Sequence, residues 1–284
     1  MAKPARPYRS VLYIPGSKDR ALEKARDLAA DAIIFDLEDA VAPEEKPRAR
    51  DILAAALQAD YGARSRIVRI NGFDTEWGRA DALAFADHPG VDAVLIPKVS
   101  TPADLDAVAA IVPGKPLWAM METALGMLNA GIIAAHPALQ GMVTGTNDLA
   151  KELGSRFRGD RLPLMTGLGL CLLAAKAHDR VIVDGVYNAF KDDEGLRVEC
   201  EQGRDMGFDG KTLIHPLQLD IANAAFAPSE AEIDLARRQI EAFEAALALG
   251  QAVAVVDGKI VENLHIVTAK ATLARADAIA ALAV

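Results

Sequence analysis

Acidic side chains follow several short apolar segments of this sequence, and two of them have the chemistry of metal ligands. Glu122 comes directly after Leu117–Met121, and Asp148 comes shortly after another apolar segment, Gly141–Gly145. A carboxylate at a buried strand end is costly unless a cation neutralises it. Carboxylate oxygens suit Mg²⁺, and Mn²⁺ accepts the same ligands. Glu122 and Asp148 are therefore our predicted metal ligands, although each could instead cap the helix that follows.

Two basic residues occupy similar positions. Arg69 has apolar neighbours on both sides, in Ile67–Asn71. It could form a structural salt bridge, or its planar guanidinium could bind a substrate carboxylate or an enolate oxygen. Lys98 follows Ile96-Pro97 and could form a Schiff base if burial lowered its pKa. Nearby acids should keep Lys98 protonated, so we disfavour a metal-free Schiff-base aldolase.

A further acidic group, Asp36-Leu-Glu-Asp39, follows an early apolar segment. We predict that Glu38 and Asp39 belong to the catalytic site. For Asp36, helix capping or a structural hydrogen bond is as consistent with the sequence as a catalytic role.

Basic residues are concentrated near the N-terminus. They are Arg9, Lys18, Arg20, Lys24 and Arg26. Arg20 and Lys24 share one helix face at a spacing of four residues. Together with the Gly16-Ser17 turn, this group could bind a phosphate-bearing ligand. Each residue alone is more typical of a solvated helix face, but their clustering on an acidic protein favours anion binding.

The scaffold that must position these residues alternates short apolar segments with helical ones. We predict eight strands, at Ser10–Pro15, Asp31–Asp36, Arg66–Asn71, Asp92–Pro97, Pro116–Glu122, Gly141–Gly145, Arg180–Asp184 and Gly210–His215. Near-continuous apolar strands between helices indicate a parallel sheet covered by helices. Eight such units predict an α/β fold, the (β/α)8 TIM barrel, whose active site lies at the carboxyl ends of the strands. A doubly wound fold would require a GxGxxG turn after the first strand, where the sequence has Pro15-Gly-Ser-Lys-Asp instead.

The helices between these strands are expected at Lys18–Ala30, Glu44–Ala59, Trp77–Asp87, Pro102–Val112 and Ala124–Ala135. The longer connection 146–179 is rich in glycine, and we interpret it as a loop at the barrel mouth. We place the barrel domain at 1–228. Residues 229–284 should form a long helix, a hairpin turning at Asp257-Gly258 and a final helix. This segment is too small to bury enough apolar surface alone, so it should act as a lid packed on its own barrel or on a neighbouring subunit.

Composition excludes a disordered, collagen-like or fibrous coiled-coil chain. The 284 residues are 51% hydrophobic and 25% charged, as in ordinary globular proteins. The net charge of −9 disfavours nucleic-acid and anionic-membrane partners. Without a long apolar run or a signal-peptide core, we expect a cytoplasmic location. Cys171 and Cys200 match no metal or redox motif and should be buried thiols, and the five histidines form no metal-binding pattern.

Seven motifs resemble, in order, the citrate lyase beta-subunit-like family of the aldolase/citrate lyase superfamily. They are Arg9–Gly16, Phe35–Val41, Val68–Asn71, Ile96–Lys98, Met121–Thr123, Gly145–Leu149 and Leu213–Pro216. The resemblance covers essentially the whole chain and implies a Mg²⁺-dependent barrel that acts on CoA thioesters. It also implies a homotrimer or hexamer in which the C-terminal segment covers a neighbour's site. Within the family, the chain is most similar to the enzymes of malyl-CoA, the lyases and the (3S)-malyl-CoA thioesterases.

The resemblance also assigns roles to residues. By motif, Glu122 and Asp148 match the metal ligands, and Arg69 matches the substrate-binding arginine. The positions near CoA are Tyr13, Arg20, Lys24, Ile214 and His215.

One position departs from the family pattern. Family lyases carry an aspartate in the C-terminal hairpin, where this chain has Glu262 in Gly258-Lys-Ile-Val-Glu262. The extra methylene displaces the carboxylate, and a small misplacement of a catalytic group can cost about 10²-fold in rate. We therefore expect Glu262 to be catalytic and to favour hydrolysis of (3S)-malyl-CoA to malate and CoA over C–C cleavage to acetyl-CoA and a 2-oxo acid.

A third interpretation is a CoA-thioester-binding subunit without catalysis. The retention of Glu122, Asp148 and Arg69 argues against it, because binding CoA alone requires none of them.

Overall fold

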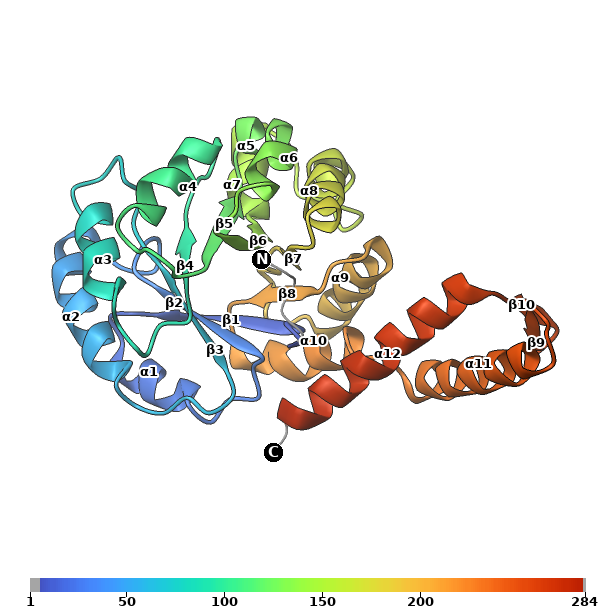
Figure 1. Ribbon diagram of the computed structural model, residues 1–284. Helices are drawn as coiled ribbons and strands as arrows, with labels where there is room; N and C mark the ends of the chain where they lie inside the picture. Colours follow the sequence, from blue (N-terminus) through green and yellow to red (C-terminus); the bar gives the residue numbers. More distant parts are fainter. Residues whose placement is uncertain (1–5, 283–284) are drawn as a thin grey trace. The chain divides into compact units, whose positions relative to one another are not determined.

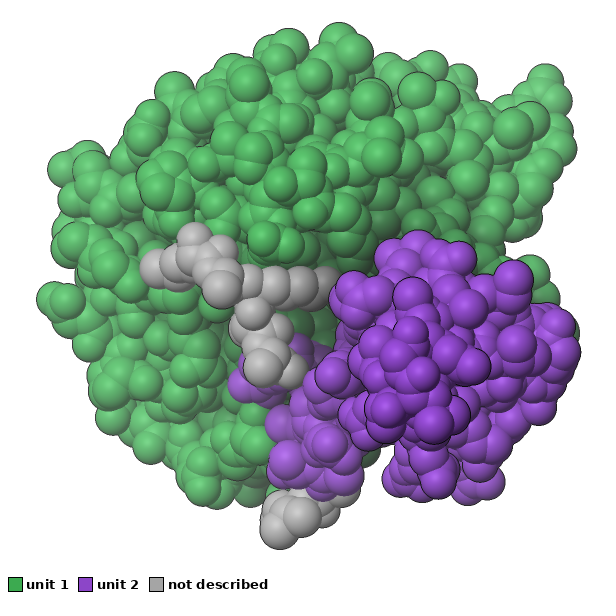
Figure 2. Space-filling view, turned by 45° about the vertical axis from the view of Figure 1, so that its right-hand side comes forward, with its two compact units in different colours: residues 1–4, 8–226 green, residues 5–7, 227–284 purple. Residues whose placement is uncertain are grey.

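The structure, a computed structural model, describes residues 6–282. The chain divides into two compact units, coloured separately in Figure 2. The first contains Tyr8–Phe226, and the second contains the chain from Ala227 onward.

The first unit is a closed barrel of eight parallel strands, arranged in sequence order (Figure 1). The strands are β1 (Ser10–Pro15), β2 (Ala32–Asp36), β3 (Ser65–Arg69), β4 (Ala93–Ile96), β5 (Leu117–Met121), β6 (Leu139–Thr144), β7 (Val181–Asp184) and β8 (Gly210–Leu213). The barrel closes where β8 pairs with β1, with Leu213 opposite Leu12. The predicted (β/α)8 fold is confirmed.

Helices surround this barrel. They are α1 (Asp19–Ala25), α2 (Lys46–Ala56), α3 (Gly78–Phe85), α4 (Pro102–Ala109), α5 (Ala124–Leu128), α6 (Ala130–Ala134), α7 (Thr146–Glu152), α8 (Met165–Ala177), α9 (Asp193–Met206) and α10 (Leu219–Ala225). Short 3₁₀ turns lie at η1 (Pro43–Glu45), η2 (Leu162–Leu164) and η3 (Pro216–Gln218).

Two of the predictions for this region are wrong. The single helix expected at Ala124–Ala135 is broken at Asn129, whose side-chain amide donates a hydrogen bond to the Ser100 carbonyl (2.8 Å). The connection 146–179 is not a continuous loop, because it contains α7 and α8. Its glycines suggested a loop, yet Gly167 lies within α8, where a β-carbon would come within 3.2 Å of Leu149. That glycine allows close packing between helices rather than breaking one.

Alternation along the strands produces two apolar layers. In β2, Ala32 and Ile34 belong to the cluster inside the barrel, whereas Ile33 and Phe35 belong to the layer between strands and helices. Trp118 is fully buried within the barrel. Both cysteines are buried and free, as predicted. None of the helices in the described part of the chain is long and apolar enough to cross a membrane.

The second unit consists of α11 (Glu230–Ala248), β9 (Ala254–Val256), β10 (Lys259–Val261) and α12 (Asn263–Leu282). Strands β9 and β10 form the predicted antiparallel hairpin. Asp257 and Gly258 form its turn, with φ of 50° and 74°, the left-handed values that such two-residue turns require. The unit has its own small apolar cluster, which includes Phe243, Val256 and Val261.

Candidate active site

A cavity of about 360 Å³ lies at the carboxyl ends of the barrel strands. Six of the predicted site residues line it: Tyr13, Asp39, Arg69, Glu122, Asp148 and Ile214. Asp36 lines it as well. The fold thus brings together residues that are up to about 200 positions apart in the sequence, as expected for the mouth of a TIM barrel.

Arg69, the last residue of β3, is held by Asp36, the last residue of β2. The two residues are directly opposite in the strand register. The Arg69 Nε donates to Asp36 Oδ1 (2.8 Å), and Nη2 donates to Oδ2 (2.6 Å). Both side chains are buried, with exposed fractions of 7% and 3%. Burial lowers the pKa of Arg69 and Asp36 raises it, with a net increase that keeps the guanidinium charged.

Asp36 also organises the turn after β2. Its carboxylate accepts hydrogen bonds from the backbone N–H groups of Glu38 (2.9 Å) and Ala40 (3.1 Å). The structural and functional interpretations of Asp36 therefore do not exclude each other, because one carboxylate shapes the turn and orients Arg69.

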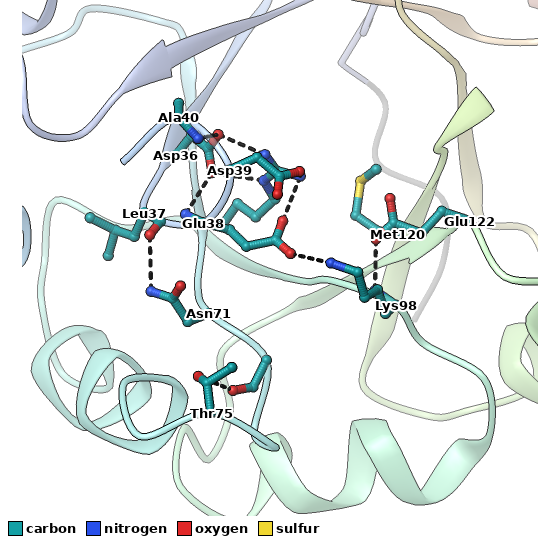
Figure 3. Close-up of polar contacts among 12 residues, drawn as sticks. Asp36, Leu37, Glu38, Asp39, Ala40, Asn71, Thr75, Lys98, Met120 and Glu122 are labelled. Atoms are coloured by element: carbon teal, nitrogen blue, oxygen red, sulfur yellow. Dashed lines mark hydrogen bonds and ion pairs between the residues drawn. The ribbon is translucent and has the colours of Figure 1, made fainter. Parts of the chain in front are cut away.

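Glu38 and Asp39 bring two more carboxylates to Arg69 (Figure 3). Arg69 Nη1 lies 2.8 Å from Glu38 Oε2 and 3.3 Å from Asp39 Oδ2. The first contact is a close ion pair that lacks the alignment of a hydrogen bond. Glu38 is buried, whereas the Asp39 side chain is 61% exposed. Glu38 faces a separate cavity behind this turn rather than the central one.

Lys98 binds Glu38 from the opposite side. Its Nζ donates to Glu38 Oε1 (2.6 Å). Burial lowers the pKa of Lys98, while the hydrogen bond with Glu38 raises it, and the net effect is an increase. A Schiff-base lysine needs the opposite shift. The prediction that neighbouring acids keep Lys98 protonated is confirmed.

Glu122 directly follows β5 and is only 2% exposed. Its Oε1 accepts a hydrogen bond from the backbone N–H of Lys98 (2.8 Å). Burial raises the pKa of Glu122 to about 7, an effect that this hydrogen bond opposes and that Glu38 and Asp148 reinforce. In the absence of a cation, this carboxyl group is therefore partly protonated near neutral pH.

Asp148 lies in the first turn of α7, after β6, and is half-buried. Between β6 and α7, Gly145 packs against Glu122, and a β-carbon there would lie 2.5 Å from Glu122 Oε2. A glycine is therefore required to leave Glu122 its position beside Asp148.

The donor set fits a magnesium ion. Glu122 and Asp148 line the same cavity, and the buried Glu122 is costly to ionise without a cation. No group of three His, Cys, Asp or Glu side chains forms a ready-made metal site within residues 6–282. Mg²⁺ usually takes one or two protein carboxylates and completes its octahedron with water and substrate oxygens. Glu122 and Asp148 satisfy that requirement.

The remaining predicted residues do not line this cavity. Arg20 and Lys24 are exposed on α1. His215 caps η3, where its Nδ1 accepts from the Leu217 N–H (3.2 Å), and its ring stacks on Phe190. Glu262 is exposed in the second unit, where its backbone N–H donates to His265 Nδ1 (3.0 Å).

Part of the predicted basic group has a structural role instead. The Arg9 guanidinium forms a two-point ion pair with Asp31, at 2.9 and 2.8 Å. Arg26 donates to the Asp60 carbonyl (3.1 Å). The Arg9 guanidinium is therefore committed to Asp31, whereas the contact of Arg26 uses its Nε and leaves the exposed side chain available to an anion.

Lys46 is a supporting residue that sequence reasoning missed. It is only 6% exposed. Its Nζ donates to the carbonyls of Leu37 (3.0 Å) and Glu38 (2.7 Å) and to Asn71 Oδ1 (2.7 Å). In the sequence it stands among charged residues at a helix start, so only its position beneath the turn distinguishes it from a solvated lysine.

We predict that Asp36→Asn lowers the free energy of unfolding by about 3 kcal/mol, because removing one partner leaves the buried Arg69 charge incompletely compensated. Urea unfolding measures this change. Asp92→Asn is the matched control, since the Arg66–Asp92 pair has a similar two-point geometry but is partly exposed, with exposed side-chain fractions of 24% and 40%. The control should lose no more than about 1 kcal/mol. Equal losses in the free energy of unfolding of the two variants would show that burial does not increase the contribution of the Arg69–Asp36 pair to stability.

Comparison with known proteins agrees with this geometry. The model of the HpcH/HpaI aldolase/citrate lyase family matches residues 9–216. A (3S)-malyl-CoA thioesterase of Cereibacter sphaeroides (strain KD131 / KCTC 12085) is 75% identical over 282 residues, which is 99% of each chain. An L-malyl-CoA/beta-methylmalyl-CoA lyase of Cereibacter sphaeroides (strain ATCC 17029 / ATH 2.4.9) is 35% identical over 311 residues, covering 99% of this chain and 98% of the lyase.

A solved structure has the same fold. CitE from Mycobacterium tuberculosis, in complex with magnesium, acetoacetate and coenzyme A, matches with a TM-score of 0.82 at 29% sequence identity. The match covers 96% of this chain and 100% of CitE. The barrel, its acidic mouth and the family match lead to one conclusion: this chain belongs to the HpcH/HpaI aldolase/citrate lyase family.

Proposed function

We propose that this chain is a Mg²⁺-dependent hydrolase that converts (3S)-malyl-CoA to malate and CoA. The observation that carries the proposal is the 75% identity, over 99% of both chains, with a (3S)-malyl-CoA thioesterase. The lyase relative is far more distant, at 35% identity. A cavity that combines two metal-binding carboxylates with an arginine suits a substrate that carries a thioester, a hydroxyl and a carboxylate.

Glu122 and Asp148 are the residues that would hold Mg²⁺. The CitE structure with bound magnesium supports a metal in this family, and Mn²⁺ favours the same oxygen ligands. When bound there, the metal supplies positive charge and polarises substrate oxygens.

Arg69 is suited to stabilise the oxyanion that forms when water attacks the thioester. Its guanidinium has five N–H donors, and three hydrogen bonds direct it towards Asp36 and Asp39. Two N–H groups remain, and the one on Nη1 lies beside Glu38. The second N–H of Nη2 is therefore the donor suited to meet developing negative charge without reorganisation, because Asp36 already fixes the plane of the guanidinium. Arg69 lines the cavity together with Glu122.

Asp39 is the barrel carboxylate best placed to direct the water. Four carboxylates line the cavity, namely Asp36, Asp39, Glu122 and Asp148. Asp36 is fully engaged with Arg69 and its own turn, and we assign the last two to the metal. Asp39 would accept a proton as the water oxygen attacks the thioester carbon and the C–S bond breaks. The proton would then pass to the departing CoA thiolate.

We further propose that CoA is bound along the side of the mouth formed by β1 and β8. Tyr13 and Ile214 line the cavity there. Arg20, Lys24 and His215 follow these two strands in the sequence and offer charge and a stacked ring for the CoA phosphates and adenine. Residues 229–284 would act as a lid in a homotrimer or hexamer, with Glu262 supplied to another copy.

The direct test is product analysis after the purified protein is incubated with (3S)-malyl-CoA and Mg²⁺. We expect free malate and CoA, with no glyoxylate. Glyoxylate together with acetyl-CoA would instead identify a C–C lyase. Unchanged substrate would contradict both activities, and a chelator control should abolish turnover.

The raised pKa of Glu122 predicts a pH-dependent metal affinity. Below its pKa of about 7, Mg²⁺ must displace a proton from this carboxyl group. The apparent affinity should therefore fall, by up to about tenfold per pH unit, as the pH drops below that value, and level off above it. Titration calorimetry in buffers of different ionisation enthalpy would measure both the affinity and the released proton.

The control for this measurement is Glu122→Gln, which should lose both Mg²⁺ binding and proton release. An affinity that stays constant across the acidic range would contradict our assignment of the protonated ligand to Glu122.

The two candidate carboxylates make separate predictions. Asp39→Asn should lower kcat for hydrolysis by about 10²-fold with little change in KM, because the shape is kept and only the base is lost.

Glu262→Asp should raise the ratio of lyase to hydrolase products, since it restores the aspartate of the family lyases. Full activity in Asp39→Asn would exclude it as the base, and an unchanged product ratio in Glu262→Asp would remove the length of this side chain as the reason for hydrolysis.

A further inference from the structure

Lys98 contacts both Glu122, a proposed metal ligand, and Glu38, which pairs with Arg69. Its backbone N–H donates to Glu122 Oε1 (2.8 Å), and its Nζ donates to Glu38 Oε1 (2.6 Å). The second carboxylate oxygen of Glu38 lies 2.8 Å from Arg69 Nη1. A continuous series of polar contacts therefore runs from the metal-binding side, through Lys98 and Glu38, to Arg69. Figure 3 shows the part of this series around Lys98.

The backbone of Lys98 has an unusual conformation. Its φ is +52°, in the left-handed region, which is unfavourable for a residue with a β-carbon. The next residue along the chain is also fixed, because the Val99 N–H donates to the Met120 carbonyl of β5 (3.2 Å). Non-glycine residues keep such conformations only where surrounding contacts impose them, and these positions concentrate at functional sites.

The positive charge of Lys98 has an electrostatic effect of its own on a nearby cation site. Lys98 lines a shallow cavity with Glu122, Asp148 and Lys151. An ammonium group beside a cation site repels the cation. Electrostatics alone therefore predicts that removal of the Lys98 side chain should tighten Mg²⁺ binding.

We propose that Lys98 is a positioning residue whose ion pair with Glu38 holds its backbone in the left-handed conformation and thereby aims its N–H at Glu122. This role rests on the metal site of the proposed function. It requires that loss of the side chain weaken Mg²⁺ binding, which is the opposite sign to the electrostatic expectation.

Lys98→Ala and Lys98→Gly separate the two contributions. Alanine loses the ion pair but keeps the β-carbon and its conformational strain, so the backbone should relax away from Glu122. Glycine also loses the ion pair but adopts positive φ without strain, so the N–H can stay in place. We expect Mg²⁺ affinity about five- to tenfold weaker than in the parent for Lys98→Ala, and equal or slightly tighter for Lys98→Gly.

The measurement is calorimetric titration of the metal-free protein with MgCl₂ at a pH of about 8 and without substrate. Lys151→Ala is the matched control, because it removes another ammonium group from the same cavity. Its Mg²⁺ affinity should be unchanged or tighter. Glu38→Gln breaks the ion pair from the other side and should weaken binding as Lys98→Ala does. Thermal unfolding of each variant verifies that it is folded.

Specific results would overturn the proposal. Mg²⁺ binding by Lys98→Ala as tight as in the parent, or tighter, would leave only the electrostatic effect. Equal weakening in Lys98→Ala and Lys98→Gly would assign the effect to the side chain rather than to the backbone conformation. A parent protein that binds no Mg²⁺ would contradict the metal site itself, and this role with it, whereas the product analysis tests the hydrolase activity independently.

Discussion

The ion pair between Arg69 and Asp36 is the interaction on which the barrel mouth depends. It joins the last residues of two adjacent strands through two short hydrogen bonds in a buried setting. The same aspartate holds the turn that carries Glu38 and Asp39. Because a guanidinium is planar and has donors on several edges, one arginine can bind three carboxylates and still present an N–H group to a ligand. The orientation of the candidate catalytic groups therefore follows from this pair.

The mouth is also strongly acidic, which favours the binding of a cation. Five carboxylates, those of Asp36, Glu38, Asp39, Glu122 and Asp148, lie at the mouth, and Arg69 and Lys98 form ion pairs with the first three of them. Burial, reinforced by the nearby carboxylates of Glu38 and Asp148, raises the pKa of Glu122 to about 7. A bound divalent ion would reverse that shift and make the arrangement favourable at neutral pH.

The strands and the segments that connect them contribute differently to the site. The strands are buried on both faces and bring their carboxyl ends to one rim, while turns and short helices add the side chains that contact a ligand. Supporting contacts beneath the rim, such as Lys46 under the turn after β2 and Gly145 beside Glu122, restrict how those side chains can move. Such preorganisation is what allows fixed donors to stabilise a developing charge.

Apolar periodicity is a local signal, so the residue types alone predict the eight strands and the barrel. They also place Arg69 and Glu122 at strand ends and Asp148 shortly after one, and the barrel brings every strand end to one mouth. Which charged groups meet depends on how the whole chain folds. The double role of Asp36, the burial of Lys46 and the structural pairing of Arg9 with Asp31 all depend on partners 20 or more residues away or on burial. The same holds for the left-handed backbone of Lys98 and its bond to Glu122. Residue type shows that a side chain is charged, but its environment, which arises from long-range packing, decides whether that charge is solvated, structural or catalytic.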